Sequence, residues 1–217
     1  MMKILFWNVY RLGRTSEKAG DIEAQLDHHF DTDGVEYAFL CEMTSDVELW
    51  GDMITKQGVK RKRSKALTRR QLGYAGLDDT GANVALTSMP DLVGRKSKRN
   101  VVMTQIPGQV KWFIYHANSS GMASELIVNL VTNIKATYPK ESFILFGDMN
   151  CEPDELIDEL KTSSRDVYTG VRFRSSGASH RRGRTLDWCI SYNCRTDVTT
   201  KTPVDNPSDH SILIIEV

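Results

Sequence analysis

Residues 142–150, SFILFGDMN, decide the fold, because an apolar run ends there in a group of polar residues. Residues 142–148 predict a buried strand, since a short apolar run bounded by a turn signal is typical of a strand inside a packed sheet. Asp148 and Asn150 adjoin this run, so the end of the sheet would hold both side chains rigidly. Asp and Asn are also common in loops, and this simpler interpretation covers each residue when it is taken alone.

Similar apolar runs predict strands along most of the chain, and some of these strands are followed by helices. The expected strands cover residues 3–9, 37–42, 81–88, 100–106, 110–117, 142–148, 185–191 and 210–217. Helices are expected over residues 15–29 and 121–138, with a short one after Pro153. Because strands dominate, two sheets with helices outside them, an α/β sandwich, fit better than a strict alternation of strand and helix.

Length and composition favour one domain over residues 1–217, since 40% of the residues are hydrophobic and 26% are charged. No apolar run approaches the roughly 20 residues of a membrane span. Residues 1–11 lack the cleavage site of a secretory signal. The four cysteines show neither paired nor zinc-site spacing, so a reduced protein without zinc is expected. We therefore expect a cytoplasmic protein, or one that is delivered without a cleavable signal peptide.

The 28 basic and 28 acidic residues cancel, but they are unevenly distributed along the chain. Basic residues gather in 56–70, 95–99 and 172–184, whereas acidic residues gather in 21–46 and 152–159. A single basic run is more often a solvated face than a binding site. Three such runs with separate acidic patches predict a bipolar surface, which suits a protein that holds cations and also meets phosphate.

Polar residues stand at the ends of most predicted strands, and their combination is more informative than any one of them. A lone histidine such as His116 is more often a satisfied core residue than a catalyst, and single Asn, Asp or Glu residues often form caps or turns. The coincidence is harder to attribute to capping, because the residues end separate strands: Asn8, Glu42, His116, Asp148, Asn150, Asp187, Asp209 and His210.

Other histidines and two tryptophans have simpler interpretations. His28, His29 and His180 show no ligand spacing and are expected on the surface. Trp7 and Trp188 adjoin site residues, and core packing beneath the site is favoured over base stacking.

Six short motifs resemble the endonuclease/exonuclease/phosphatase superfamily, whose fold is called DNase I-like. GDMN and SDH are weak motifs when taken alone, but six motifs in the right order form a strong signal. They are WN (7–8), LCEM (40–43), HAN (116–118), GDMN (147–150), LDW (186–188) and SDH (208–210). The resemblance implies a four-layer α/β/β/α sandwich of two mostly antiparallel sheets.

Three longer stretches are similar to the catalytic B subunit of the cytolethal distending toxins. They are GANVALTS (81–88), HANSSGMASELIVNLV (116–131) and RGRTLDWCIS (182–191). The resemblance implies a metal site in which Glu42 binds Mg²⁺, with Mn²⁺ or Ca²⁺ in support, and in which Asn8 and Asp209 complete or orient the site. Mg²⁺ is a hard cation that takes few carboxylates and keeps several waters.

The resemblance also implies catalytic roles at the scissile phosphate. Asp148 would position or deprotonate the attacking water, and Asn150 would donate a hydrogen bond to the phosphate. His116 and His210 would flank the phosphate, stabilising charge or acting as acid and base. Asp187 would orient His210 and raise its pKa, as a carboxylate does for a neighbouring imidazole.

This chain departs from the superfamily pattern at two points. A second Glu often pairs with the first catalytic histidine, and only Asp78 or Asp79 could replace it here. The toxin subunits carry an Arg where this chain has Gly81, so Arg99 is expected to contact phosphate instead. The other residues expected to bind substrate are Asn83, Asn118, Lys60 and Arg61.

The expected activity is Mg²⁺-dependent cleavage of phosphodiester bonds by a largely non-sequence-specific DNA endonuclease. The basic runs favour a nucleic acid, DNA first, over a single phosphomonoester. The same fold also serves phosphoinositide phosphatases, which are the nearest alternative, and a non-catalytic binding module is less favoured. We expect a monomer with no obligate protein partner and no membrane span.

Overall fold

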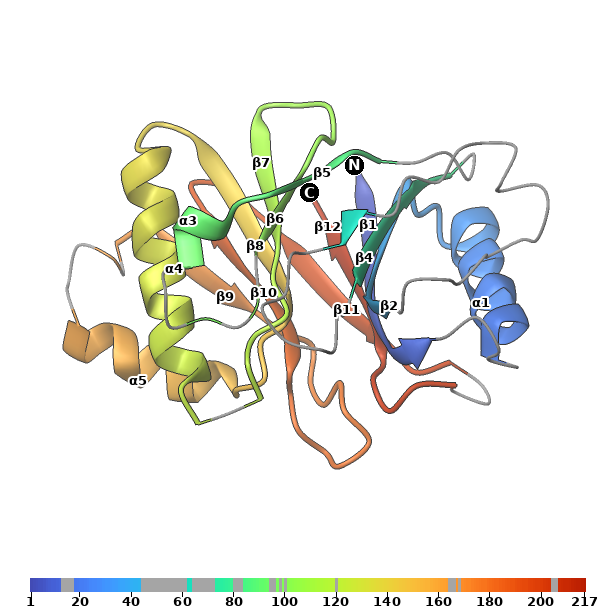
Figure 1. Ribbon diagram of the computed structural model, residues 1–217. Coiled ribbons are helices and arrows are strands. Elements are labelled where there is room, and N and C mark those ends of the chain that lie inside the picture. Colours follow the sequence, from blue (N-terminus) through green and yellow to red (C-terminus); the bar gives the residue numbers. More distant parts are fainter. Residues whose placement is uncertain are drawn as a thin grey trace.

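Two six-stranded sheets form the centre of the computed structural model (Figure 1). The structure describes residues 1–12, 18–43, 62–63, 73–79, 84–93, 97, 99, 101–119, 121–163, 167, 169–203 and 207–217. The first sheet has the order β11-β12-β1-β2-β4-β3 and the second the order β5-β6-β7-β8-β10-β9. Within each sheet one pair is parallel, β1 with β2 and β7 with β8, and the other neighbours are antiparallel. The prediction of mostly antiparallel sheets is therefore confirmed.

The strands of the first sheet come from both ends of the chain, whereas those of the second come from its middle. The first sheet contains β1 (Lys3–Leu12), β2 (Tyr37–Met43), β3 (Lys62–Arg63), β4 (Gly73–Asp78), β11 (Asp197–Lys201) and β12 (Ile212–Glu216). The second contains β5 (Leu86–Ser88), β6 (Val102–Thr104), β7 (Val110–Ile114), β8 (Ser142–Asp148), β9 (Val171–Arg174) and β10 (Asp187–Tyr192).

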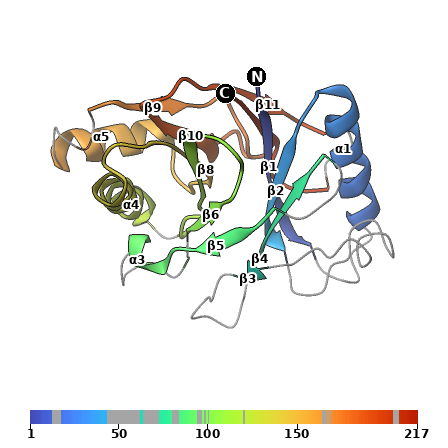
Figure 2. The ribbon, with the colours of Figure 1, turned by 90° about the horizontal axis from the view of Figure 1, so that it is seen from above.

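Helices cover the outer face of each sheet, so the four-layer prediction is confirmed (Figures 1 and 2). Helix α1 (Lys18–Thr32) lies on the first sheet. Helices α3 (Pro90–Val93), α4 (Ala123–Thr137) and α5 (Pro153–Ser163) lie on the second. None of the helices in the described ranges is long and apolar enough to cross a membrane.

Strand β8 shows why its sequence is apolar without alternation. Ile144 and Phe146 point into the core between the two sheets, where Phe146 contacts the aromatic ring of Phe6 from β1. Phe143 and Leu145 point the other way, into the core beneath α4. Because both faces of the strand are buried, a polar residue is tolerated only where the strand ends. The apolar run therefore fixes the position of Asp148.

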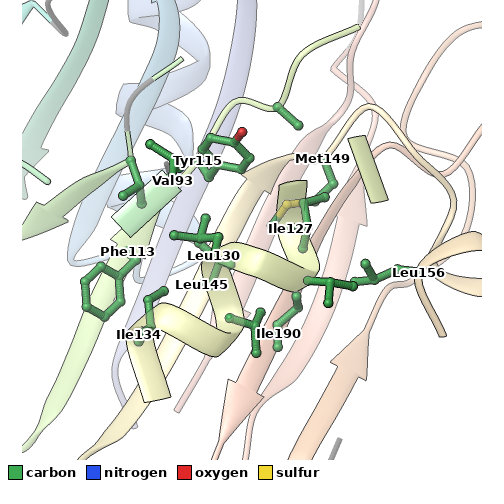
Figure 3. Packing of buried hydrophobic residues seen from close by; sticks show 14 of the residues in the cluster. Val93, Phe113, Tyr115, Ile127, Leu130, Ile134, Leu145, Met149, Leu156 and Ile190 are labelled. Carbon is green, nitrogen blue, oxygen red and sulfur yellow. The ribbon is translucent and has the colours of Figure 1, made fainter. Parts of the chain in front are cut away.

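The outer core of the second sheet is built around α4. Figure 3 shows Ile127, Leu130 and Ile134 of α4 packed over Phe113 and Leu145 of the sheet. The spacing of these helical residues is the 3.6-residue period that predicts the helix from the sequence. Burial of this face holds α4 on the sheet.

Some strands lie where the sequence predicts none, and some predicted strands are shorter than expected. The sequence does not predict β3, β4, β9 and β11. β3 and β9 lie in basic runs, β4 contains two glycines, and β11 is an edge strand with exposed side chains. Within the described part of residues 81–88, only Leu86–Ser88 is a strand. The last strand begins at Ile212 rather than at residue 210, and His210 forms an isolated bridge with His180 instead.

Candidate active site

Strand directions bring the polar residues from both sheets to one edge of the molecule. β1, β2, β7 and β8 end at this edge, whereas β10 and β12 run in the opposite direction and begin there. A hydrogen bond from Asn8 Nδ2 to Asp148 Oδ2, 2.9 Å, joins the two sheets. We call this group the candidate site: Asn8, Glu42, His116, Asp148, Asp187, Asp209 and His210.

Asp148 lies at the centre of the candidate site. Its Oδ2 accepts the Asn8 hydrogen bond and lies 3.5 Å from His116 Nε2 and 3.8 Å from His210 Nε2. Asp187 is its direct partner on β10. Burial raises the pKa of Asp148, and the like charge of Asp187 raises it further. Asp148 is therefore a stronger base than an ordinary aspartate.

One contact holds the ring of His210, and another holds its backbone. Its Nδ1 lies 2.8 Å from Asp187 Oδ2, and its carbonyl accepts a 3.0 Å hydrogen bond from Trp7 Nε1. Burial lowers the pKa of His210, but the hydrogen bond to Asp187 and the charges of three aspartates outweigh it and raise the pKa to about 9. The ring is therefore an imidazolium near neutral pH. Trp7 is fully buried beneath the site, as the core-packing interpretation expects.

Two serines hold the backbone around His210 and Asp187: Ser208, which is the first residue of the SDH motif, and Ser179, which lies in none of the six motifs. Ser208 Oγ donates to the Asn8 carbonyl at 2.5 Å and accepts the His210 N–H at 3.1 Å. Ser179 Oγ is buried and accepts the backbone N–H groups of Leu186 and Asp187. Serine hydroxyls form such local bonds throughout proteins, so the sequence gives no signal for Ser179.

His116 lies between carboxylates on one side and a guanidinium on the other. Its Nε2 is 3.5 Å from Glu42 Oε1, and its Nδ1 is 3.2 Å from Arg99 Nη1. Arginine can only donate, so Nδ1 is the acceptor and the ring proton lies on Nε2. Burial lowers the pKa of His116 well below its ordinary value, and the charges of Arg99 and His210 lower it further. His116 is therefore a neutral hydrogen-bond donor.

The expected carboxylate partner of His116 is not Asp78 or Asp79. Asp78 pairs with Tyr37 at the start of β2, which is the opposite end of the strand from Glu42. Asp79 follows it and donates its N–H to the Glu36 carbonyl. Arg99 occupies the Nδ1 side of His116 instead, and this contact joins two segments that sequence spacing does not relate.

The GDMN motif makes a tight turn at the end of β8. Gly147 has φ +146°, and a Cβ there would lie 1.9 Å from the Tyr115 carbonyl oxygen, so only glycine fits. Asn150 has φ +50°, donates its N–H to Asp148 Oδ1 and donates its Nδ2 to the Ala117 carbonyl. Glu42 also has a positive φ, +60°, and such backbone conformations in non-glycine residues cluster at functional sites.

Two of the three histidines expected on the surface are not surface residues. His29 is buried, and its Nδ1 lies 2.6 Å from Asp33 Oδ2. His180 is half-buried, and its Nε2 lies 3.4 Å from Asp209 Oδ2 at the candidate site. The His180 contact depends on segments that the fold brings together, so spacing along the sequence could not reveal it. His29 and Asp33 are only four residues apart, which is a spacing that places two side chains next to each other on a helix.

The expected substrate-binding residues divide into two groups. Asn83, Lys60 and Arg61 lie outside the described residues. Arg99 contacts His116, and Asn118 is largely buried with an Oδ1 that accepts no hydrogen bond from the described part of the chain.

The oxygen donors of the candidate site fit a hard divalent cation. Glu42, Asp148 and Asp209 supply carboxylates, and Asn8 supplies an amide. Asp209 Oδ1 is buried and accepts no hydrogen bond from any described residue. A buried carboxylate oxygen is costly without a partner, and a cation that prefers oxygen ligands would satisfy it.

Solved structures of known proteins share this arrangement of sheets and helices. CdtB, the biologically active subunit of cytolethal distending toxin, matches with a TM-score of 0.70 and 16% identity over 99% of this chain and 97% of that chain. Truncated TDP2 from Caenorhabditis elegans matches with a TM-score of 0.64 and 15% identity over 99% and 96% of the two chains. The endonuclease domain of TRAS1, a telomere-specific non-LTR retrotransposon, matches with a TM-score of 0.65 and 15% identity over 100% and 98%.

These structural neighbours belong to the DNase I-like superfamily, so the chain has the DNase I-like fold that its motifs predict. No protein-family model matches the sequence, and no curated protein matches it significantly.

Proposed function

We propose that this chain is a metal-dependent phosphodiesterase, and that it is a DNA endonuclease with little sequence preference. It would act as a single domain and a monomer. One observation carries the proposal: a basic carboxylate, Asp148, lies between a neutral imidazole, His116, and a charged imidazole, His210. Environments that push the pKa values of neighbouring groups apart separate acid and base roles. The DNase I-like fold supports the same conclusion.

The cation would be Mg²⁺, held by Glu42 with Asn8 and Asp209. When bound, it neutralises the phosphate oxygens and stabilises the charge that develops during hydrolysis. The oxygen-only donor set of these residues favours Mg²⁺ or Mn²⁺ over softer metals.

The side chains of this chain supply the proton transfers. In hydrolysis, a water oxygen bonds to phosphorus while the bond from phosphorus to the leaving oxygen breaks. Asp148 accepts a proton from the attacking water, because its raised pKa makes it a better base than an ordinary aspartate. His210 donates a proton to the leaving oxygen, and Asp187 keeps its ring oriented. His116 donates its Nε2–H to a phosphate oxygen.

Basic groups around the candidate site support a polyanionic substrate. Arg181 and Arg182 follow His180 in an exposed turn, and the Arg181 N–H bonds the Asp209 carbonyl. A nucleic acid backbone meets several cations at once, whereas a single phosphomonoester does not.

The test compares purified protein on plasmid DNA, on RNA and on an inositol lipid, each with Mg²⁺ and with EDTA. We expect nicking or linearisation of plasmid that requires Mg²⁺. His116→Ala and Asp148→Ala should each lower the rate about 10²–10⁴-fold, because each removes a group that acts on the reacting atoms.

Asp197→Asn, on the exposed edge strand β11, is the matched control and should cut at the parental rate. If the protein releases phosphate from the inositol lipid and leaves the plasmid uncut, the nuclease proposal is wrong and the protein is a phosphoinositide phosphatase. A His116→Ala or Asp148→Ala protein that cuts as fast as the parent would show that the site is elsewhere.

A further inference from the structure

His180 lies against the candidate site although it belongs to a loop that carries none of the six motifs. Its Nε2 is 3.4 Å from Asp209 Oδ2, and its ring is 5.0 Å from the ring of His210, edge to face. Asp209 Oδ1 lies 3.9 Å from His210 Nε2. The carboxylate of Asp209 therefore lies between two imidazoles, each facing a different oxygen.

Backbone contacts fix His180 in this position. His180 and His210 form an antiparallel bridge, in which the Ser211 N–H donates to the Ser179 carbonyl at 2.7 Å. The Arg181 N–H donates to the Asp209 carbonyl at 2.9 Å. These backbone hydrogen bonds attach the loop to the segment before β12. The backbone alone therefore places His180 next to Asp209.

The hydrogen bond on the other side of the ring determines which nitrogen carries the proton. The Arg182 backbone N–H donates to His180 Nδ1 at 3.2 Å. A backbone N–H can only donate, so Nδ1 is unprotonated and the proton of the neutral ring lies on Nε2. A protonated Nε2 cannot coordinate a cation, so His180 is a donor to Asp209 and not a metal ligand.

We infer that His180 is a positioning residue, which holds Asp209 Oδ2 through its Nε2–H and leaves Oδ1 for the cation. Asp209 Oδ1 is the buried oxygen without a hydrogen bond from the described residues. The inference rests on the proposed function, because it requires that Asp209 helps to bind the cation. Hydrogen-bond partners of metal ligands typically change metal affinity or activity about 10–100-fold when they are removed.

The experiment measures binding of Mn²⁺ alone to the full chain by the loss of its free EPR signal, with Mg²⁺ as competitor. We expect His180→Ala to weaken Mn²⁺ binding roughly 10–100-fold. His180→Gln should restore most of the affinity, since its amide nitrogen can donate in place of Nε2. Thermal melts of each protein show that the fold is intact, and His180→Gln carries the test if the alanine variant does not fold.

His28→Ala is the matched control, because His28 is an exposed histidine of α1 that lies in a separate group with His29 and Asp33. It should bind Mn²⁺ as the parent does. If the parent binds Mn²⁺ and His180→Ala binds it equally well, His180 does not position Asp209 and the inference is wrong. The same holds if His180→Gln binds as weakly as His180→Ala. If the parent binds neither Mn²⁺ nor Mg²⁺, the proposed function fails and this inference fails with it.

Discussion

The two histidines of the candidate site differ in charge because their Nδ1 atoms face opposite partners. His210 Nδ1 faces the Asp187 carboxylate, and the pKa of His210 rises to about 9. Burial lowers the pKa of His116 well below its ordinary value, and the charge of the Arg99 guanidinium, which faces Nδ1, lowers it further. Burial acts on both imidazoles, and only at His210 do the hydrogen bond to Asp187 and the neighbouring carboxylates outweigh it.

Replacing Asp187 with Asn should remove the raised pKa of His210 and its effect on stability. The folded protein keeps a proton on His210 between about pH 6.5, the pKa of an unfolded histidine, and about 9. The protonated His210 therefore adds to the free energy of unfolding. This stabilisation is complete below pH 6.5 and is lost as the pH rises through about 9. The rise in the pKa of His210 corresponds to roughly 3 kcal/mol of stabilisation of the folded protein.

Urea denaturation in EDTA at pH 6, 7.5 and 9.5 measures this effect without bound metal. Asp187→Asn should be less stable than the parent at pH 6, and the difference should shrink toward pH 9.5. Asp197→Asn, exposed on β11, should follow the parent at every pH. A constant difference across the three pH values would show that His210 does not titrate through Asp187.

At the scale of elements, the backbone at the end of β8 packs closely against the segment that follows β7. Beyond the end of β7, the Tyr115 and Ala117 N–H groups still donate to the Phe146 and Asp148 carbonyls. This extension carries His116 alongside Asp148, and it requires that nothing larger than hydrogen stands at Gly147. The GDMN motif is thus a backbone requirement as well as the source of the Asp148 carboxylate at the candidate site.

Gly147→Ala should destabilise the protein by about 3 kcal/mol or more, because the new Cβ meets backbone and the positive φ is strained. Gly20→Ala is the control, since a Cβ there meets nothing within 4 Å and Gly20 lies in α1. It should stabilise the protein by roughly 0.5–1 kcal/mol, as alanine does in a helix. Urea midpoints of the two variants should move in opposite directions, and a Gly147→Ala midpoint equal to the parental value would contradict the close approach.

At the scale of the whole molecule, the net charge of zero conceals a local excess of basic residues beside the site. Arg181 and Arg182 are exposed and follow His180, whereas Arg184 contacts Glu152 and Glu155. Within the basic run of residues 172–184, Arg184 is thus paired with carboxylates, whereas Arg181 and Arg182 are exposed to solvent. Only the open part is expected to meet phosphate.

Arg181→Gln with Arg182→Gln should weaken DNA binding and reduce its salt dependence. The slope of log affinity against log salt should decrease by about 1 for each phosphate contact that is lost. Fluorescence anisotropy of a labelled duplex in EDTA, from low to physiological salt, measures this slope without cleavage. Arg172→Gln is the control, because Arg172 is exposed on β9 and pairs with Ser191, away from the start of β10. A slope unchanged in the double variant would show that the turn is only a solvated face.

The sequence predicts the sheets, the layers and the strand-end residues because buried strands leave a clear apolar pattern. Asp148 and Glu42 could be found since each follows such a run directly. His180 could not, because its loop has no apolar run and reaches Asp209 only by pairing with the segment before β12. The contact of Arg99 with His116 was equally hidden, since it depends on packing between segments rather than on spacing.

The position of β12 between β1 and β11 makes the candidate site depend on segments that are far apart in the sequence. Asn8 lies on β1, His210 precedes β12, and 202 positions separate them. A variant without β12 would lose the pairing of β12 with β1, and with it the backbone that carries His210 to Asp187. The candidate site is therefore complete only in a chain whose first sheet has formed.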